Sequence, residues 1–212
     1  MKPPSQHLVD WDGAPRALLG AAASLGRAVT VIGITGPVGA GKSTLAARLT
    51  ACILRTDDYL PDYASIRYLE RDEPRHADLA RLAADLAELR AGRAAATPVW
   101  SFHTHRREGE RRIEPAPVVV CEGIHALEDA VLTSIDIRVF VDAPAVVRWG
   151  RWEDLERRGV RGWGVAAARE YFDRVAEPTF DSARARYRAA AHMIVSNAQA
   201  GAGAKQPGQS GS

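Results

Sequence analysis

The sequence is short of cysteine, of long apolar runs and of any excess of charge. Its two cysteines, Cys52 and Cys121, each lie in an apolar stretch and lack CxxC or metal-ligand spacing. We therefore expect small buried side chains in a reducing cytoplasm rather than a disulfide or a metal site. Lys and Arg together number 28 against 26 Asp and Glu, and the formal charge of +2 gives no overall attraction to nucleic acid or to an anionic membrane.

No apolar run approaches the roughly 20 residues that a transmembrane helix needs, so no membrane partner is expected. The stretch 17–26 (ALLGAAASLG) could imitate the apolar core of a signal peptide, but Asp10 and Asp12 precede it and a nucleotide-binding motif follows. An amphipathic helix is the better interpretation. Residues 198–212 are small, polar and turn-prone, which predicts a disordered tail.

Short apolar runs alternate along the chain with segments that have helical spacing. Strands are expected at 29–34, 53–56, 118–121, 135–141 and 193–195. Helices are expected at 43–53 and at 77–90, where leucines recur at helical spacing ahead of Gly92. Strands separated by helices predict a three-layer α/β fold with a central parallel sheet. We expect an N-terminal helical segment at 1–28 and one main domain at 29–197.

A glycine-rich turn follows the first expected strand. Residues 36–44 read GPVGAGKST and satisfy the pattern G-x-x-x-x-G-K-[ST] between a strand and a helix. Backbone N–H groups must turn inward around phosphate oxygens there, which a Cβ would obstruct. This position disfavours an incidental glycine turn and predicts ATP binding. The nucleotide-binding residues are expected to be Gly36, Pro37, Val38, Gly39, Ala40, Gly41, Lys42, Ser43 and Thr44.

Acidic residues follow two of the expected strands. Asp57 and Asp58 come after 53–56, and Glu122 comes after 118–121. In an open parallel sheet the ligand site lies outside the carboxyl ends of the strands, so these side chains should approach the glycine-rich turn. Asp57 could instead cap a helix or form an Asx-turn. Glu122 ends an apolar strand, where a carboxylate is costly unless it faces a cation, so Ser43, Asp57 and Glu122 are the expected magnesium ligands.

The segment 100–117 is polar, basic and irregular, and we expect a hairpin or loop that rises from the sheet. Within it, His103 and His105 form an HxH pair that could bind a metal. No third ligand occurs nearby at metal spacing, so a substrate-binding loop is the better interpretation.

Arginines and tryptophans are mixed between residues 148 and 163. Trp149, Trp152 and Trp163 could suggest nucleic-acid stacking, but the near-neutral charge of the whole chain favours a packed lid. Taken without further context, the arginines of this stretch could equally form a solvated helix face.

The motifs GPVGAGKST, TDDYL, DEPRHAD, PVWSFHTHRR, VVVCEGIH and RWEDLERRGVRG occur in this order. In this respect the chain resembles the uridine kinase and phosphoribulokinase family of P-loop kinases from about residue 29 to residue 197. The pattern P-x-x-x-F-x-x-H-x-R ahead of a strand that ends in Glu-Gly is similar to uridine-cytidine kinases. The resemblance implies a P-loop NTPase fold with a small acceptor-binding hairpin insertion and an arginine-rich lid.

The resemblance also implies roles for single residues. Asp57 would take the proton of the acceptor hydroxyl and approach magnesium, and Glu122 would belong to the magnesium shell. Asp72 would hold ribose hydroxyls, and Phe102 and His105 would face a pyrimidine. The further residues placed beside the acceptor are Asp58, Tyr59, Trp100 and Arg107.

The same resemblance places a lid at Arg151, Arg157, Arg158 and Arg161. Such a lid would close over the transferred phosphoryl group, whose developing charge guanidinium groups stabilise. Arg158 and Arg161 are expected to act in catalysis with Lys42, and Arg148 is expected to contact the nucleotide.

The chain departs from the family on the acceptor side. Tyr59 and Leu60 stand where Phe-Tyr is usual, Trp100 and Ser101 stand where Tyr and Asp are usual, and RGVRGWG brings extra glycines and a tryptophan into the lid. These changes bear on the choice of acceptor more than on the transfer chemistry.

The predicted activity is therefore ATP- and magnesium-dependent phosphorylation of a primary hydroxyl, with uridine or cytidine as the acceptor. Pantothenate, a sugar acid or another riboside is the alternative acceptor. A nucleotide-dependent switch is a further alternative, although the N-K-x-D motif of GTPases is missing. We expect a cytoplasmic protein with a small-molecule partner and no nucleic acid, and the sequence leaves a homo-oligomer open.

Overall fold

A computed structural model describes residues 6–198 of the chain. Within these residues, six parallel strands form one sheet in the order β1-β8-β7-β2-β6-β3. Its strands are β1 (His7–Asp10), β2 (Thr30–Thr35), β3 (Ile53–Arg55), β6 (Val118–Glu122), β7 (Ile137–Asp142) and β8 (Met193–Ser196). The expected central parallel sheet is confirmed. The expected disordered tail lies outside the described residues from 199 onward.

The N-terminal segment contains a strand as well as the expected helix. Helix α1 (Ala14–Ser24) is present, and β1 pairs in parallel with β8, with His7 opposite Met193. The four residues of β1 are mostly exposed at the edge of the sheet, so they show no apolar pattern in the sequence. The described part of segment 1–28 therefore extends the sheet of the main domain.

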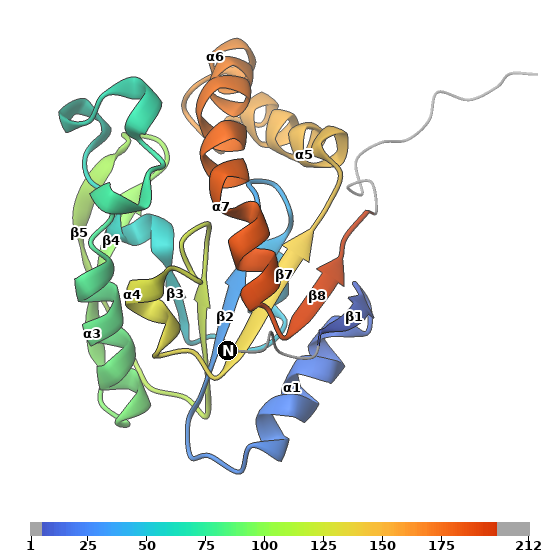
Figure 1. Ribbon diagram of the computed structural model, residues 1–212. Coiled ribbons are helices and arrows are strands. Elements are labelled where there is room, and N and C mark those ends of the chain that lie inside the picture. Colours follow the sequence, from blue (N-terminus) through green and yellow to red (C-terminus); the bar gives the residue numbers. More distant parts are fainter. Residues whose placement is uncertain (1–5, 199–212) are drawn as a thin grey trace, which may run out of the picture.

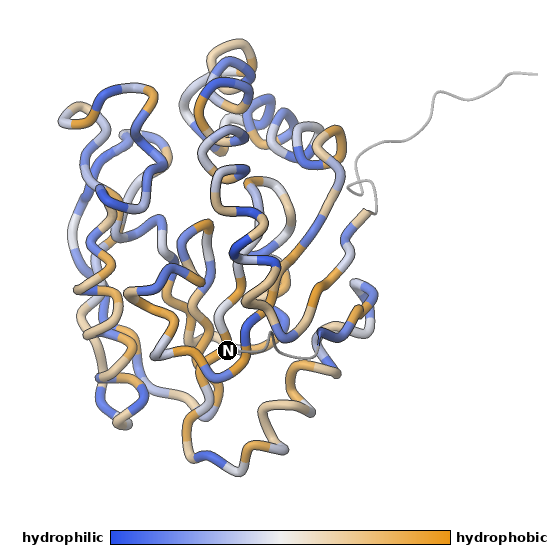
Figure 2. Tube along the Cα trace, in the orientation of Figure 1, coloured by the Kyte–Doolittle hydropathy of each residue, from blue (hydrophilic) through white to orange (hydrophobic). Residues whose placement is uncertain are grey.

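Helices cover both faces of the sheet (Figure 1). On one face, α1 and α2 (Lys42–Ala47) pack on strand residues such as Ile34 and Val139. On the other face, α3 (Leu79–Arg90), α4 (Asp129–Leu132) and α7 (Glu177–Ala190) pack on residues such as Val119. Figure 2 shows the hydrophobic colouring concentrated along the strands and the inner helix faces. No helix within residues 6–198 is long and apolar enough to cross a membrane.

Helix α3 confirms the helix that leucine spacing predicted at 77–90. All four of its recurring leucines are buried, the side chain of Asp78 caps its first turn through Arg81 N at 3.1 Å, and Gly92 follows it with a φ of 75°. The two cysteines are likewise buried free thiols, as expected.

An antiparallel hairpin of β4 (Ala95–Ser101) and β5 (Arg106–Ile113) stands beside the main sheet. The hairpin begins at Ala95, earlier in the chain than the expected segment 100–117, because β4 also includes the five residues before Trp100. Four short helical turns connect β3 to α3, at Thr56–Tyr59, Tyr63–Ser65, Tyr68–Glu70 and Pro74–His76.

The lid region lies above the carboxyl ends of the strands (Figure 1). Helix α5 (Ala145–Arg157) follows β7, and α6 (Val165–Tyr171) continues through a wide helical turn at Phe172–Ala176 into α7. Residues 158–164 connect α5 to α6, and we call them the lid loop. An apolar cluster joins this region to the hairpin and includes Tyr63, Trp100, Trp152 and Tyr171.

Candidate functional site

A cavity of about 280 Å³ lies at the carboxyl end of the sheet, between the glycine-rich turn, the hairpin and the lid. The expected residues that line it on the phosphate side are Val38, Gly39, Gly41, Lys42, Ser43, Thr44, Asp57 and Glu122. Those that line it on the acceptor and lid side are Asp72, Trp100, Phe102, His105 and Arg161. Asp57, which follows β3, and Glu122, which ends β6, therefore lie beside the glycine-rich turn at the carboxyl end of the sheet.

The glycine-rich turn has room for backbone only. A Cβ on Gly39 would lie 2.5 Å from the carbonyl oxygen of Arg148, and one on Gly41 would lie 2.4 Å from Nδ2 of Asn197. Both residues also have positive φ angles, of 74° and 104°. Glycine is thus required at these positions, and a concave backbone surface of this kind is suited to phosphate oxygens.

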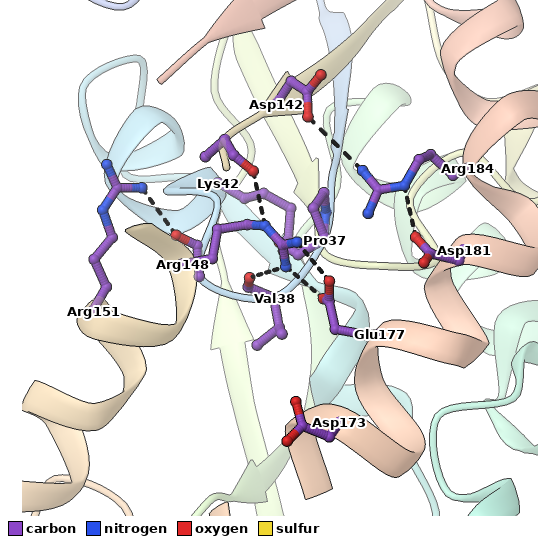
Figure 3. A network of polar contacts seen from close by, with 12 residues as sticks. Pro37, Val38, Lys42, Asp142, Arg148, Arg151, Asp173, Glu177, Asp181 and Arg184 are labelled. Atoms are coloured by element: carbon purple, nitrogen blue, oxygen red, sulfur yellow. Dashed lines mark hydrogen bonds and ion pairs between the residues drawn. The ribbon is translucent and has the colours of Figure 1, made fainter. Parts of the chain in front are cut away.

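Lys42 is buried beside this turn. Its Nζ donates a hydrogen bond to the carbonyl oxygen of Pro37 at 3.1 Å (Figure 3). Burial lowers the pKa of Lys42, and the nearby carboxylates of Glu122 and Asp57 act in the opposite direction. An anionic ligand in the cavity would add to their effect and would favour the charged ammonium group.

Oxygen atoms suited to magnesium converge on the same cavity. The Ser43 hydroxyl donates to Oε1 of Glu122 at 2.8 Å, and Asp57 lines the cavity with them. Burial raises the pKa of Glu122, and the positive charges of Lys42 and Arg55 act in the opposite direction. Hydroxyl and carboxylate oxygens are the donors that magnesium prefers. No cluster of three or more His, Cys, Asp or Glu side chains occurs among the described residues, which leaves His103 and His105 without a third metal ligand.

The two adjacent aspartates have different surroundings. Asp57 lies in the turn Thr56–Tyr59, which has no side-chain cap, so the capping alternative does not describe it. Asp58 is buried away from the cavity, where it accepts a hydrogen bond from the backbone N–H of Trp100 at 3.2 Å and pairs with Arg111 at 2.8 Å. Asp58 thus anchors the hairpin, unlike the acceptor-binding role expected from its position.

Two more residues that were expected beside the acceptor face elsewhere. Tyr59 is fully buried in the core, and its hydroxyl donates to Asp85 at 2.7 Å. Arg107 is exposed on β5 and does not line the cavity, and its backbone N–H donates to Asp62 at 2.8 Å. Both residues were expected beside the acceptor because of their positions in a motif. A motif does not determine which way a side chain points.

Asp72 is held by two tyrosines in the wall of the cavity. Oδ1 of Asp72 accepts hydrogen bonds from Tyr171 at 2.6 Å and from Tyr63 at 3.1 Å. Burial raises the pKa of Asp72 to about 6, against the opposing effect of these hydroxyl donors. The carboxyl group is thus fixed in orientation and titrates near neutral pH.

Aromatic rings form the remaining acceptor side. The ring of Tyr63 lies 4.9 Å from that of Trp100 and is nearly parallel to that of His105 at 5.8 Å. Trp100 is fixed by a hydrogen bond from its Nε1 to the carbonyl oxygen of Pro61 at 3.1 Å. Burial lowers the pKa of His105, which favours the neutral imidazole.

The lid arginines divide into two groups. Arg161 lines the cavity, with its guanidinium 4.3 Å from the ring centre of Phe102. Arg151 also lines it and donates to the carbonyl oxygen of Gly39 at 2.9 Å. Arg157 and Arg158 instead pair with acidic residues along the exposed side of α5, at 2.8 Å and 2.9 Å. The solvated-face alternative therefore describes these two, and Arg158 is not brought to the cavity.

Arg148 lies behind the glycine-rich turn rather than in the cavity. Its guanidinium pairs with Glu177 of α7, at 2.6 Å from Nη2 to Oε2, and donates to the carbonyl oxygen of Val38 at 3.3 Å (Figure 3). Arg148 thus braces the turn against α7, whereas direct contact with the nucleotide was expected.

Further cavity residues come from the connecting turns, the lid loop and α5–α6, and they are Leu60, Tyr63, Ile124, Arg151, Trp152, Leu155, Glu156, Trp163 and Tyr171. The resemblance places Arg151 in the lid, and Leu60, Trp152 and Trp163 stand out in the sequence as departures from the family or as lid tryptophans. The other five carried no sequence signal. Tyr171 belongs to a helix that no motif marked.

Comparisons with known proteins identify the family and the fold. A family model described as the phosphoribulokinase / uridine kinase family matches residues 61–200. A uridine kinase of Brevibacillus brevis is 34% identical over 145 residues, which span 61% of this chain and 68% of that protein. A uridine kinase of Alkaliphilus metalliredigens is 35% identical over 144 residues, spanning 60% and 69%. The solved structure of a possible uridine kinase from Bacillus stearothermophilus has a TM-score of 0.61 at 15% identity, covers 86% of this chain and 98% of its own, and shares the fold.

Proposed function

The chain belongs to the phosphoribulokinase / uridine kinase family of phosphotransferases that act on hydroxyl acceptors, and we propose that it transfers the γ-phosphoryl group of ATP to the 5′-hydroxyl of uridine or cytidine. The observation that carries the proposal is the convergence on one cavity of Lys42, Asp57, Glu122 and Asp72. The first three serve the phosphoryl group and its counter-ion, and Asp72 offers a fixed acceptor for hydroxyl groups.

The residues around the glycine-rich turn fit a magnesium–nucleotide complex. The backbone of the turn lines the cavity at Gly39 and Gly41 and would receive the phosphates, and Ser43, Asp57 and Glu122 would hold the metal. Bound magnesium would supply positive charge that offsets the charge developing on the phosphate oxygens.

The remaining chemistry belongs to side chains of this chain. Asp57 accepts the proton of the acceptor hydroxyl while the new bond forms between that oxygen and the γ-phosphorus. The bond from the γ-phosphorus to the bridging oxygen breaks at the same time, and ADP leaves with the electron pair. Lys42 and Arg161 neutralise the charge on the transferred group, and Asp72 orients the acceptor through its hydroxyls.

The substitution Asp57→Asn tests this assignment, because it removes the proton acceptor and retains the shape of the side chain. We expect ADP release from the wild-type chain to be stimulated by uridine or cytidine, and the variant to lose activity by about 10²–10⁴-fold. Binding of ADP, measured by isothermal titration calorimetry, should change little. The matched control is Asp129→Asn, at an exposed position on α4.

Turnover retained by Asp57→Asn would remove Asp57 as the base. Release of ADP that no acceptor stimulates would instead favour the nucleotide-dependent switch.

A second acceptor class has support from one observation. Leu60 and Trp100 line the cavity at positions where the sequence departs from the family pattern. Another hydroxylated acceptor, such as pantothenate, a sugar acid or a different riboside, would use the same transfer residues. A screen of such acceptors by ADP release separates this possibility from uridine and cytidine.

A further inference from the structure

Trp163 closes the aromatic part of the cavity from the lid loop. Its ring centre lies 4.1 Å from that of Tyr171 and 4.9 Å from that of His105, and it meets both rings edge to face. Tyr63 lies 6.4 Å away in a similar relation. The sequence predicted a packed lid at this tryptophan and counted it among the departures that bear on the acceptor, and the structure places it in the wall of the cavity.

The lid loop is fixed in this position by polar contacts. Glu156 is buried at the end of α5, where its Oε2 accepts from the backbone N–H of Gly164 at 3.0 Å and its Oε1 accepts from Nε1 of Trp152 at 3.0 Å. At the other side, a Cβ on Gly162 would lie 2.9 Å from the carbonyl oxygen of His103. The loop is thus tied to α5 and lies directly against the tip of the hairpin.

The direction of the bound acceptor follows from the position of the transfer residues. The reacting hydroxyl must reach Asp57, so the rest of the acceptor lies against the aromatic residues of the same cavity. The rings of Tyr63, His105 and Tyr171 are close to parallel, with interplanar angles of 9° and 22° to Tyr63. Trp163 stands across them, at 67° to His105 and 88° to Tyr171, and lines the same cavity.

We propose that Trp163 is a specificity-determining residue that limits the size of the acceptor. The inference rests on the proposed function, because it concerns the acceptor half of that site. With Trp163 in place, the cavity takes a compact acceptor, such as an unsubstituted pyrimidine riboside. A smaller side chain at position 163 admits acceptors that carry a bulkier ring, such as 5-iodouridine or adenosine. Selectivity of this kind is steric, since a packed apolar wall rejects a larger group by overlap.

The test compares acceptors within each variant. We expect Trp163→Ala to raise the ratio of kcat/KM for 5-iodouridine to kcat/KM for uridine by about 10-fold or more, in line with the effect of one apolar group in a packed pocket. Trp163→Phe should give an intermediate ratio. The matched control is Trp149→Ala, because Trp149 packs on Phe172 at 5.6 Å and on Arg169 at 4.9 Å and does not line the cavity. This control should leave the ratio unchanged.

Calorimetric titration of both nucleosides in the presence of ADP and magnesium gives a second readout that does not depend on turnover. The proposal would be overturned if the ratio of the two kcat/KM values were unchanged in Trp163→Ala. It would also be overturned if the variant lost the same activity with every acceptor and kept the same relative affinities. Failure of the proposed function gives a different result, because the wild-type chain would then phosphorylate a compact acceptor such as ribose and would not phosphorylate uridine. In that case the size limit set by Trp163 predicts that Trp163→Ala phosphorylates uridine. If the variant does not phosphorylate uridine, the proposal for Trp163 is wrong.

Discussion

Asp72 shows how the packing of one residue can control both stability and acceptor binding. The carboxyl group is buried, and this burial raises its pKa to about 6, well above the 3.8 that is usual for an aspartate in water. Since the folded pKa is the higher one, the native state binds the proton more tightly. The stability that this preference contributes is fully present below about pH 4 and is lost as the pH rises through about 6.

The substitution Asp72→Asn should remove this pH dependence. The amide stays neutral, and its oxygen can still accept from Tyr63 and Tyr171. The free energy of unfolding of the wild-type chain, relative to that of the variant, should fall by up to about 3 kcal/mol between pH 4 and pH 7. Urea denaturation across this range measures the difference. A difference that is flat with pH would contradict the raised pKa.

Acceptor binding should show the opposite trend with pH. Tyr63 and Tyr171 both donate to Oδ1 of Asp72, which leaves Oδ2 for the hydroxyls of the acceptor. Oδ2 is a pure hydrogen-bond acceptor only in the ionised carboxylate, so the KM for the acceptor should fall as the pH rises through about 6. In Asp72→Asn the KM should be higher and should lose this dependence.

At the scale of elements, the pair of Arg148 and Glu177 joins α5, α7 and the glycine-rich turn. The side chain of Arg148 is 2% exposed and also donates to the carbonyl oxygen of Ala143 at 2.9 Å. Removing one partner of such a pair leaves the other buried charge without compensation, which is more costly than replacing both.

We expect Arg148→Met to lower the free energy of unfolding by about 3–5 kcal/mol, because Glu177 is left without its partner. The double variant Arg148→Met/Glu177→Leu should recover a large part of this loss. Arg158→Ala is the control on the same helix, and its exposed ion pair should contribute within about 0.5 kcal/mol. Urea denaturation compares the three chains, and equal stability of the single and double variants would argue against charge burial as the cause.

At the scale of the whole molecule, two apolar layers share one sheet. Leu18 of α1 belongs to the layer on one face, and Leu86 of α3 belongs to the layer on the other, and both are fully buried. Because β1 pairs with β8, the described part of the N-terminal segment is connected to the centre of the fold.

Leu18→Ala and Leu86→Ala should each cost about 2–5 kcal/mol, since each deletes a fully buried side chain. If the two layers form one cooperative unit, both substitutions shift the same thermal transition, followed by circular dichroism and by tryptophan fluorescence. The exposed position Leu8 offers a control, and Leu8→Ala should change the transition little. An early separate transition in Leu18→Ala would show that residues 1–28 fold as a unit of their own.

The sequence by itself determined the features that depend on neighbouring residues. The turn around Gly39 and Gly41, the amphipathic α3 and the alternation of the central strands with helices follow from local pattern, because backbone geometry and helical periodicity are properties of short segments. The exposed edge strand β1 has no such pattern and was not predicted. The parallel sheet follows from their alternation, and the family resemblance follows from the order of the motifs.

Only the tertiary structure decided which side chains face the cavity. Asp57 and Asp58 are adjacent, yet one lines the cavity and the other holds the hairpin through Arg111. Tyr171 and Trp163 reach the site because α6 and the lid loop fold back over the strands. The physical reason is that these contacts join segments far apart in the chain, so their partners depend on how whole elements pack and leave no mark in the local sequence.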